Sequence, residues 1–159
     1  MISKSERKRR RLALQELGER LVGLDENDLA SLSLDERLTD AIRAASAIKS
    51  REALRRQKQL IGKLMGDVDP EPVEVALRRL NAADLRARQL FGQAERWRNR
   101  LIEQGTEALL AFEEVAGTAD DELYRLVSRY QTAFGDRAKK TLRREIFGRV
   151  HEILGKIPQ

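Results

Sequence analysis

Apolar side chains recur every three or four residues through most of this 159-residue sequence, and no run of β-branched residues alternates with polar ones. Alanine, leucine, arginine, glutamate, lysine and glutamine dominate, and these residue types have high helix propensity. A spacing of three and four places side chains on one face of an α-helix, whereas a half-buried strand needs a period of two. The sequence therefore predicts an all-α fold in which each helix buries one apolar stripe.

Breakers and capping residues divide this pattern into about six predicted helices. Three hydroxyl side chains stand three positions before an acidic residue, the spacing of a capping box, at Ser3, Ser33 and Thr118. Pro72 can open a helix, because the first helical position needs no N–H donor. The predicted helices span residues 3–22, 33–65, 72–104, 106–115, 118–135 and 139–155. The third would be about 50 Å long at 1.5 Å per residue, with 81–84 as its weakest point.

The Gly- and Pro-containing break at 66–72 also predicts how the chain is organised. A length of 159 residues fits one domain or two small ones. We expect an elongated, multi-helical protein of two helical lobes, residues 1–70 and 71–159, although both lobes could share the long helix near 72–104. Charged residues make up 36% of the chain, above the roughly 25% of an ordinary domain. This fraction fits a large surface relative to the core.

The distribution of charge is more informative than the net charge of +5. The basic residues form four blocks, at residues 4–11, 43–63, 78–100 and 137–149. Acidic residues gather elsewhere, at 25–40 and 113–122. Charges that serve solubility alone are usually interspersed in sign. Segregated blocks favour a surface for a polyanion such as nucleic acid, and a solvated helix face is the alternative for any single block.

The segment SREALRRQKQLIGKL, residues 50–64, shows this segregation within one helix. A helical wheel places its apolar side chains and the following methionine on one arc: Leu54, Leu60, Ile61, Leu64 and Met65. The remaining face is almost wholly cationic and carries Arg51, Arg55, Arg56, Lys58 and Lys63. Gly62 lies within that face and weakens the helix by about 1 kcal/mol relative to alanine. Either a bulky anion approaches the backbone at Gly62, or the position marks a close helix crossing or a frayed end.

Few residues in the sequence could carry out catalysis. There is no cysteine and one histidine, His151, so Cys–His or Ser–His nucleophilic pairs and common zinc sites are nearly excluded. No Gly-rich phosphate-binding motif occurs. The acidic clusters at 25–26 and 120–122 coincide with helix boundaries, where carboxylates favour the helix N-terminus. We therefore expect no enzymatic activity, no cofactor and no bound metal.

The sequence has few aromatic residues and no recognisable targeting signal. The aromatic residues are Phe91, Trp97, Phe112, Tyr124, Tyr130, Phe134 and Phe147. Most lie on apolar stripes, which predicts core positions and argues against base-stacking platforms. Any nucleic acid would then be bound through its phosphates and its shape. There is no secretory signal and no run of 18 apolar residues, so we expect a soluble, cytoplasmic protein that does not bind membranes.

Four segments follow one another in a familiar order: ISKSERKRR, LSLDERLTDAIRAASAIKSREALRRQKQLIGKLM, LFGQAERWRNRLIEQG and REIFGRVHEIL. Together they cover most of the chain, and they resemble the bacterial dual-action ribosomal maturation protein family, DarP or YjgA. The resemblance implies an all-helical, elongated, non-enzymatic protein of two lobes. It also implies a factor that joins late precursors of the large ribosomal subunit and helps the RNA of the peptidyl-transferase region to mature. The most characteristic part is the basic motif formed by Arg55, Arg56, Gln57, Gln59, Gly62 and Lys63.

The charge pattern and the resemblance lead to one hypothesis. We expect a monomeric assembly factor whose basic helix faces bind rRNA in precursors of the large ribosomal subunit. The candidate RNA-binding residues are Lys4, Lys8, Arg9, Arg51, Arg55, Arg56, Lys58, Lys63, Lys140, Arg143 and Arg144. The alternative is a helical adaptor whose acidic and basic faces bind partner proteins.

Overall fold

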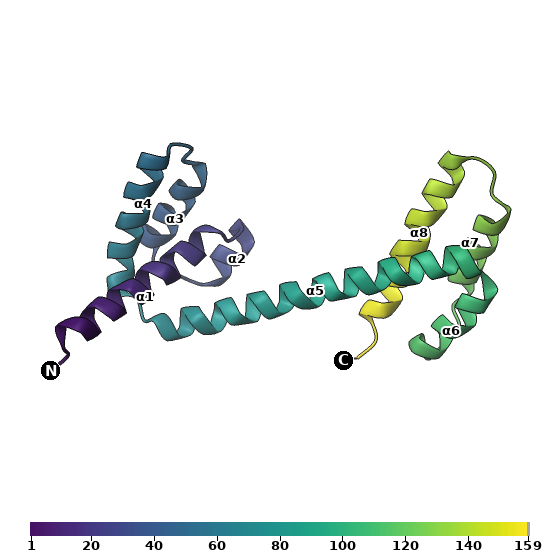
Figure 1. Ribbon diagram of the computed structural model, residues 1–159, viewed down its shortest axis with the longest axis horizontal. Coiled ribbons are helices and arrows are strands. Elements are labelled where there is room, and N and C mark those ends of the chain that lie inside the picture. The colour runs from purple at the N-terminus through teal and green to yellow at the C-terminus, as the bar shows by residue number, and fades with distance from the viewer. Residues whose placement is uncertain (159) are drawn as a thin grey trace. The chain divides into compact units, whose positions relative to one another are not determined.

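The computed structural model describes residues 1–158, and every regular element within that range is a helix (Figure 1). The elements are α1 (Lys4–Val22), α2 (Glu26–Ser31), α3 (Glu36–Ala47), α4 (Arg51–Leu64), the 3-10 helix η1 (Met65–Asp67), α5 (Pro70–Gln104), α6 (Thr106–Ala116), α7 (Asp121–Thr132) and α8 (Asp136–Gly155). The predicted all-α class is confirmed. The prediction of about six helices is wrong, because residues 1–158 contain eight α-helices.

Two helix starts that the sequence patterns did not reveal account for the difference. Asp25 accepts a hydrogen bond from the backbone N–H of Asp28 at 2.8 Å and starts α2 within a polar run. Ser50 accepts from the N–H of Ala53 at 3.4 Å and starts α4, which divides the single helix predicted over 33–65. Short polar side chains favour this position because they satisfy free N–H groups. Neither residue is followed three positions later by Glu or Gln, so the capping-box pattern is absent.

Two other predicted caps lie two residues away from the actual ones. The N-cap of α3 is Asp35 and not Ser33, and the N-cap of α7 is Asp120 and not Thr118. A carboxylate caps as well as a hydroxyl and also interacts favourably with the helix dipole. Ser3 caps α1 as predicted, by accepting a hydrogen bond from the N–H of Glu6 at 3.2 Å.

The structure divides into two compact units, Met1–Ala82 and Ala83–Gln159. In the first unit α1, α3, α4 and η1 pack against one another. The first part of α5 contributes Val73 and Leu77 to the same core. The other buried members of this core are Leu17, Leu21, Leu29, Leu38, Ala41, Ile42, Ala45, Ile61 and Met65.

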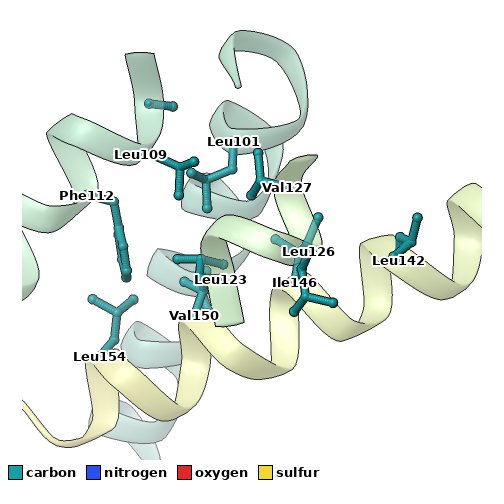
Figure 2. Close-up of a cluster of buried hydrophobic side chains, with 12 residues drawn as sticks. Leu101, Leu109, Phe112, Leu123, Leu126, Val127, Leu142, Ile146, Val150 and Leu154 are labelled. Atoms are coloured by element: carbon teal, nitrogen blue, oxygen red, sulfur yellow. The ribbon is translucent and has the colours of Figure 1, made fainter. Parts of the chain in front are cut away.

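The second unit has its own core, formed by the last part of α5 with α6, α7 and α8 (Figure 2). Leu123 and Val127 of α7 pack in this cluster with Ile146 and Val150 of α8. Phe112 of α6 is fully buried there. Among residues 1–158 no buried side chain is polar or charged, and no helix is long and apolar enough to cross a membrane.

The aromatic residues are divided between the core and the surface. Phe112 is buried, and three others pack partly against it or its neighbours: Trp97, Tyr130 and Phe147. Three are exposed: Phe91, Tyr124 and Phe134. The prediction that most of the aromatic residues occupy core positions therefore holds, with four of the seven in or against the core.

Candidate nucleic-acid interface

Helix α4 is held by a narrow part of its apolar arc. Ile61 and Met65 are fully buried, and Leu54 and Leu64 are half-buried against the same core. Leu60 is 42% exposed, although the wheel had placed it with the apolar set. It lies at the edge of that arc, next to Arg56 and Lys63 on the wheel, where no neighbouring helix covers it.

A polar contact adds to this packing. The side-chain amide of Gln57 donates a hydrogen bond from Nε2 to the backbone carbonyl of Ala41 at 2.9 Å, which ties α4 to α3. Ala41 is buried, and its carbonyl lies in the middle of α3. Gln57 belongs to the basic motif that carries the resemblance described above, and this hydrogen bond helps to position the helix that carries the cations.

The cationic face predicted for α4 is largely free of the core. Arg51, Arg55, Arg56 and Lys63 are exposed, and Lys58 is half-buried. Glu52 pairs with Arg55 at 2.8 Å and lies 3.7 Å from Arg56. Both pairs are exposed, so each is worth at most about 1 kcal/mol. Within the described part of the chain, Arg51, Lys58 and Lys63 form no ion pair within 4.0 Å.

Helix α1 packs against α4, and a surface groove lies between them. Helix α1 lines it with Arg11, Leu14 and Gln15. Helix α4 and η1 line it with Gln59, Gly62, Lys63 and Gly66. We call this the α1–α4 groove. Its lining combines two cations and two amides with no carboxylate, so it offers hydrogen-bond donors and positive charge without a competing acid.

The close helix crossing in this unit is at Gly18 of α1 and not at Gly62. A Cβ atom at Gly18 would lie 3.1 Å from Cγ2 of Ile61 and 3.3 Å from Cγ of Met65. A Cβ atom at Gly62 would meet only Cγ of Gln15, at 4.0 Å. Helix packing therefore explains the absence of a side chain at Gly18, whereas Gly62 forms part of the open floor of the groove.

The remaining candidate residues lie on two other helices. Lys4, Lys8 and Arg9 are exposed on the first half of α1, in the same unit as α4. Lys140, Arg143 and Arg144 are exposed on α8, in the second unit. The structure thus brings the α1 and α4 candidates together in one unit.

Sequence reasoning missed Arg11 and Gln15 as members of the groove. With Leu14 and Gly18 they form a stripe at spacings of three and four on α1. That stripe identifies one face of the helix. It does not identify α4 as the partner, which required the structure.

The structure gives the acidic residues and the histidine structural roles. Arg149 donates from Nε to the carboxylate of Asp120 at 3.0 Å, and this hydrogen bond lowers the pKa of Asp120 below its ordinary value. His151 stacks on Phe147 with ring centroids 5.7 Å apart. Between residues 1 and 158, no group of three or more histidine or acidic side chains is arranged to hold a metal ion.

Comparison with known proteins agrees with the four segments described above. A family model for the dual-action ribosomal maturation protein DarP matches residues 1–151. The DarP protein of Idiomarina loihiensis is 36% identical over 156 residues, covering 97% of this chain and 91% of the relative. Those of Vibrio cholerae and Pectobacterium atrosepticum are each 38% identical, covering 96% of this chain and 79% and 83% of the relatives. The chain belongs to the dual-action ribosomal maturation protein family, DarP.

Proposed function

We propose that the protein is a non-enzymatic ribosome maturation factor that binds rRNA in precursors of the large subunit through α1 and α4. The observation that carries this proposal is the α1–α4 groove, which Arg11 and Lys63 line together with no carboxylate. The family name supports the ribosome as the partner. The protein would act as a monomer in the cytoplasm, where this partner is found.

The proposed contact is electrostatic and depends on shape. Phosphate groups of RNA would meet the guanidinium and ammonium groups of α1 and α4, because such contacts supply most of the affinity for nucleic acid. The amides of Gln15 and Gln59 can donate hydrogen bonds to phosphate or sugar oxygens within the groove. Gly62 leaves the floor of the groove low enough for a backbone to approach.

Maturation requires more than affinity. A factor shifts a folding equilibrium only if it binds one RNA conformation better than another. Cations held on packed helices meet this requirement, because their spacing matches some arrangements of phosphates better than others. We propose the RNA of the peptidyl-transferase region as the target, and the resemblance of the basic motif of α4 to the family supports this assignment.

Sedimentation tests the partner, and a charge substitution tests the surface. At low salt the protein should sediment with large-subunit precursors. At high salt it should be released from them and sediment as free protein. Lys63→Ala should weaken the association and reduce the salt slope of RNA binding by roughly one contact. It should leave the thermal midpoint almost unchanged, since Lys63 is exposed.

Arg37→Ala is the matched control. It removes the same charge from an exposed position of the same unit, on α3 and away from the groove. It should retain nearly all of the wild-type association. Migration of the wild type with free protein at low salt would refute the proposal. Complexes that survive ribonuclease would favour a protein adaptor instead.

A further inference from the structure

Phe134 is the most exposed aromatic residue of the second unit. It lies between Ala133 and Gly135, in the linker that joins α7 to α8 (Figure 1). Its relative exposure is 96%, whereas its neighbour Ala133 packs against the core. The ring therefore contributes almost nothing to the packing of the fold.

The backbone around this ring is well defined. Gly135 has φ 86° and ψ 150°, a conformation that is essentially limited to glycine. On either side, the N–H of Ala133 bonds to the carbonyl of Tyr130 at 3.3 Å, and the N–H of Lys139 bonds to that of Gly135 at 3.2 Å. These bonds belong to the end of α7 and the start of α8, and Phe134 lies between them, outside the core.

The surroundings of Phe134 are polar and mainly cationic. It shares a surface hollow with Arg129 and Arg137, and Glu145 is the acid in its lining. The other lining residues are Gly135, Ala138, Thr141 and Leu142. Lys139 and Lys140 follow on α8, and Asp136 is the acidic residue of its first turn. Four cations in or next to this hollow outnumber its two acids, so the surface around the ring is complementary to the phosphates of a nucleic acid.

We propose that Phe134 stacks on an unpaired base of rRNA while Arg129 and Arg137 contact the adjacent phosphates. The proposal rests on the proposed function for its partner and adds an RNA contact in the second unit. An aromatic ring beside cations is the arrangement that binds single strands, because every base presents a π-face and every nucleotide a phosphate. Unpaired loops and bulges expose such bases, whereas A-form helices do not.

The test compares a base-containing probe with a base-free one. Phe134→Ala should weaken binding of a single-stranded oligoadenylate by about 5- to 150-fold, the range for loss of one stacked base. Binding of inorganic polyphosphate of similar charge should be unchanged. The thermal midpoint should also be unchanged, because the side chain is almost fully exposed. Tyr124→Ala is the matched control. Tyr124 is another exposed aromatic residue, but it lies on α7 after the acidic residues Asp120 to Glu122, so its surroundings should repel phosphate.

A fluorescent variant reports stacking directly. Phe134→Trp should keep the affinity for the oligoadenylate, and its fluorescence should be quenched by this RNA and not by polyphosphate. The wild type supplies the baseline, because its single tryptophan, Trp97, is packed against Phe112 with ring centroids 5.1 Å apart.

The outcomes separate this inference from the proposed function. Equal affinity of Phe134→Ala and wild type for the oligoadenylate, or an equal loss for both probes, would refute stacking. If Lys63→Ala still weakens RNA binding in that case, the proposed function stands alone. A Phe134→Ala variant that binds RNA normally but leaves ribosomal particles would identify a protein contact and also refute stacking. Selective loss with the oligoadenylate, in a protein that does not sediment with particles, would support stacking and refute the proposed function.

Discussion

Gly18 and Gly62 lie on facing helices, and they show how two residues of one type serve different purposes. Gly18 is buried where α1 crosses α4, with Ile61 and Met65 almost touching the position of its absent Cβ. Gly62 lines a groove and has space above it. The first is required by packing, and the second leaves a surface open.

A substitution to leucine at each glycine should separate the two roles. Gly18→Leu should lower the free energy of unfolding by about 1–3 kcal/mol, because the added side chain forces Ile61 and Met65 to move. Gly62→Leu should not destabilise the fold, since leucine favours a helix by almost 1 kcal/mol over glycine and the nearest atom to its Cβ would be Cγ of Gln15, at 4.0 Å. It should instead fill the groove and weaken RNA binding. Urea unfolding and RNA titration measure both effects, and a larger loss of stability at Gly62 would contradict this assignment.

At the scale of the elements, an ion pair joins the N-terminus of α7 to the middle of α8. Asp120 caps α7 by accepting from the N–H of Leu123 at 2.8 Å, and the same carboxylate accepts from Nε of Arg149 on α8. Arg149 also donates to Glu152 at 3.1 Å. The side chains of Asp120 and Arg149 are only 18% and 26% exposed, which makes this pair stronger than the exposed pairs of α4.

Removing Arg149 should therefore lower the free energy of unfolding by an amount that depends on pH. Its hydrogen bond holds the pKa of Asp120 below the ordinary value of an aspartate. A lowered pKa in the folded state stabilises the fold fully above the unfolded-state pKa of about 4, and this contribution is lost as the pH falls through the folded-state pKa. Arg149→Met should lower the free energy of unfolding by about 1–3 kcal/mol at pH 7, and the difference from wild type should shrink below pH 4.

Lys156→Met is the control for this experiment. It removes the same charge from the exposed C-cap of the same helix, where Lys156 pairs with Glu152 at 3.2 Å. Its effect should stay below about 0.5 kcal/mol. A difference between wild type and Arg149→Met that is constant from pH 7 to pH 2 would show that Asp120 is not the titrating partner.

The helical period predicted which faces are buried better than it predicted where helices end. Ile61 and Met65 are buried as expected, because a period of three and four fixes the face of a helix. The helix predicted over 118–135 includes Phe134, which continues the spacing of Val127 and Tyr130. However, α7 ends at Thr132, and the residue falls in the turn. The crossing at Gly18 could not be predicted, because a single helix does not reveal its partner.

At the scale of the whole molecule, the buried residues form two separate clusters. Leu38 and Ile42 belong to the core of the first unit, whereas Ile146 and Val150 belong to the core of the second. We propose that each unit is a folding domain in its own right. The sequence predicts the boundary at residue 70, whereas the structure divides after Ala82.

Truncating one core should leave the other intact. Leu38→Ala and Ile146→Ala should each lower the stability of their own unit by about 2–5 kcal/mol, because each removes a fully buried side chain. Hydrogen exchange followed residue by residue in the full chain should show lost protection in one unit only. Loss of protection across both units in either variant would indicate a single cooperative domain.

The apolar composition of both cores has a consequence for how the protein responds to ionic strength. No charged side chain is buried among residues 1–158, and the candidate contacts are exposed cations. Monovalent salt at about 1 M shortens the Debye length to about 3 Å and so weakens the surface attraction, while burial of apolar groups is not an interaction between charges. Raising the ionic strength should therefore weaken the attachment to RNA far more than it weakens the fold. A protein released from a particle by salt would still be a folded one.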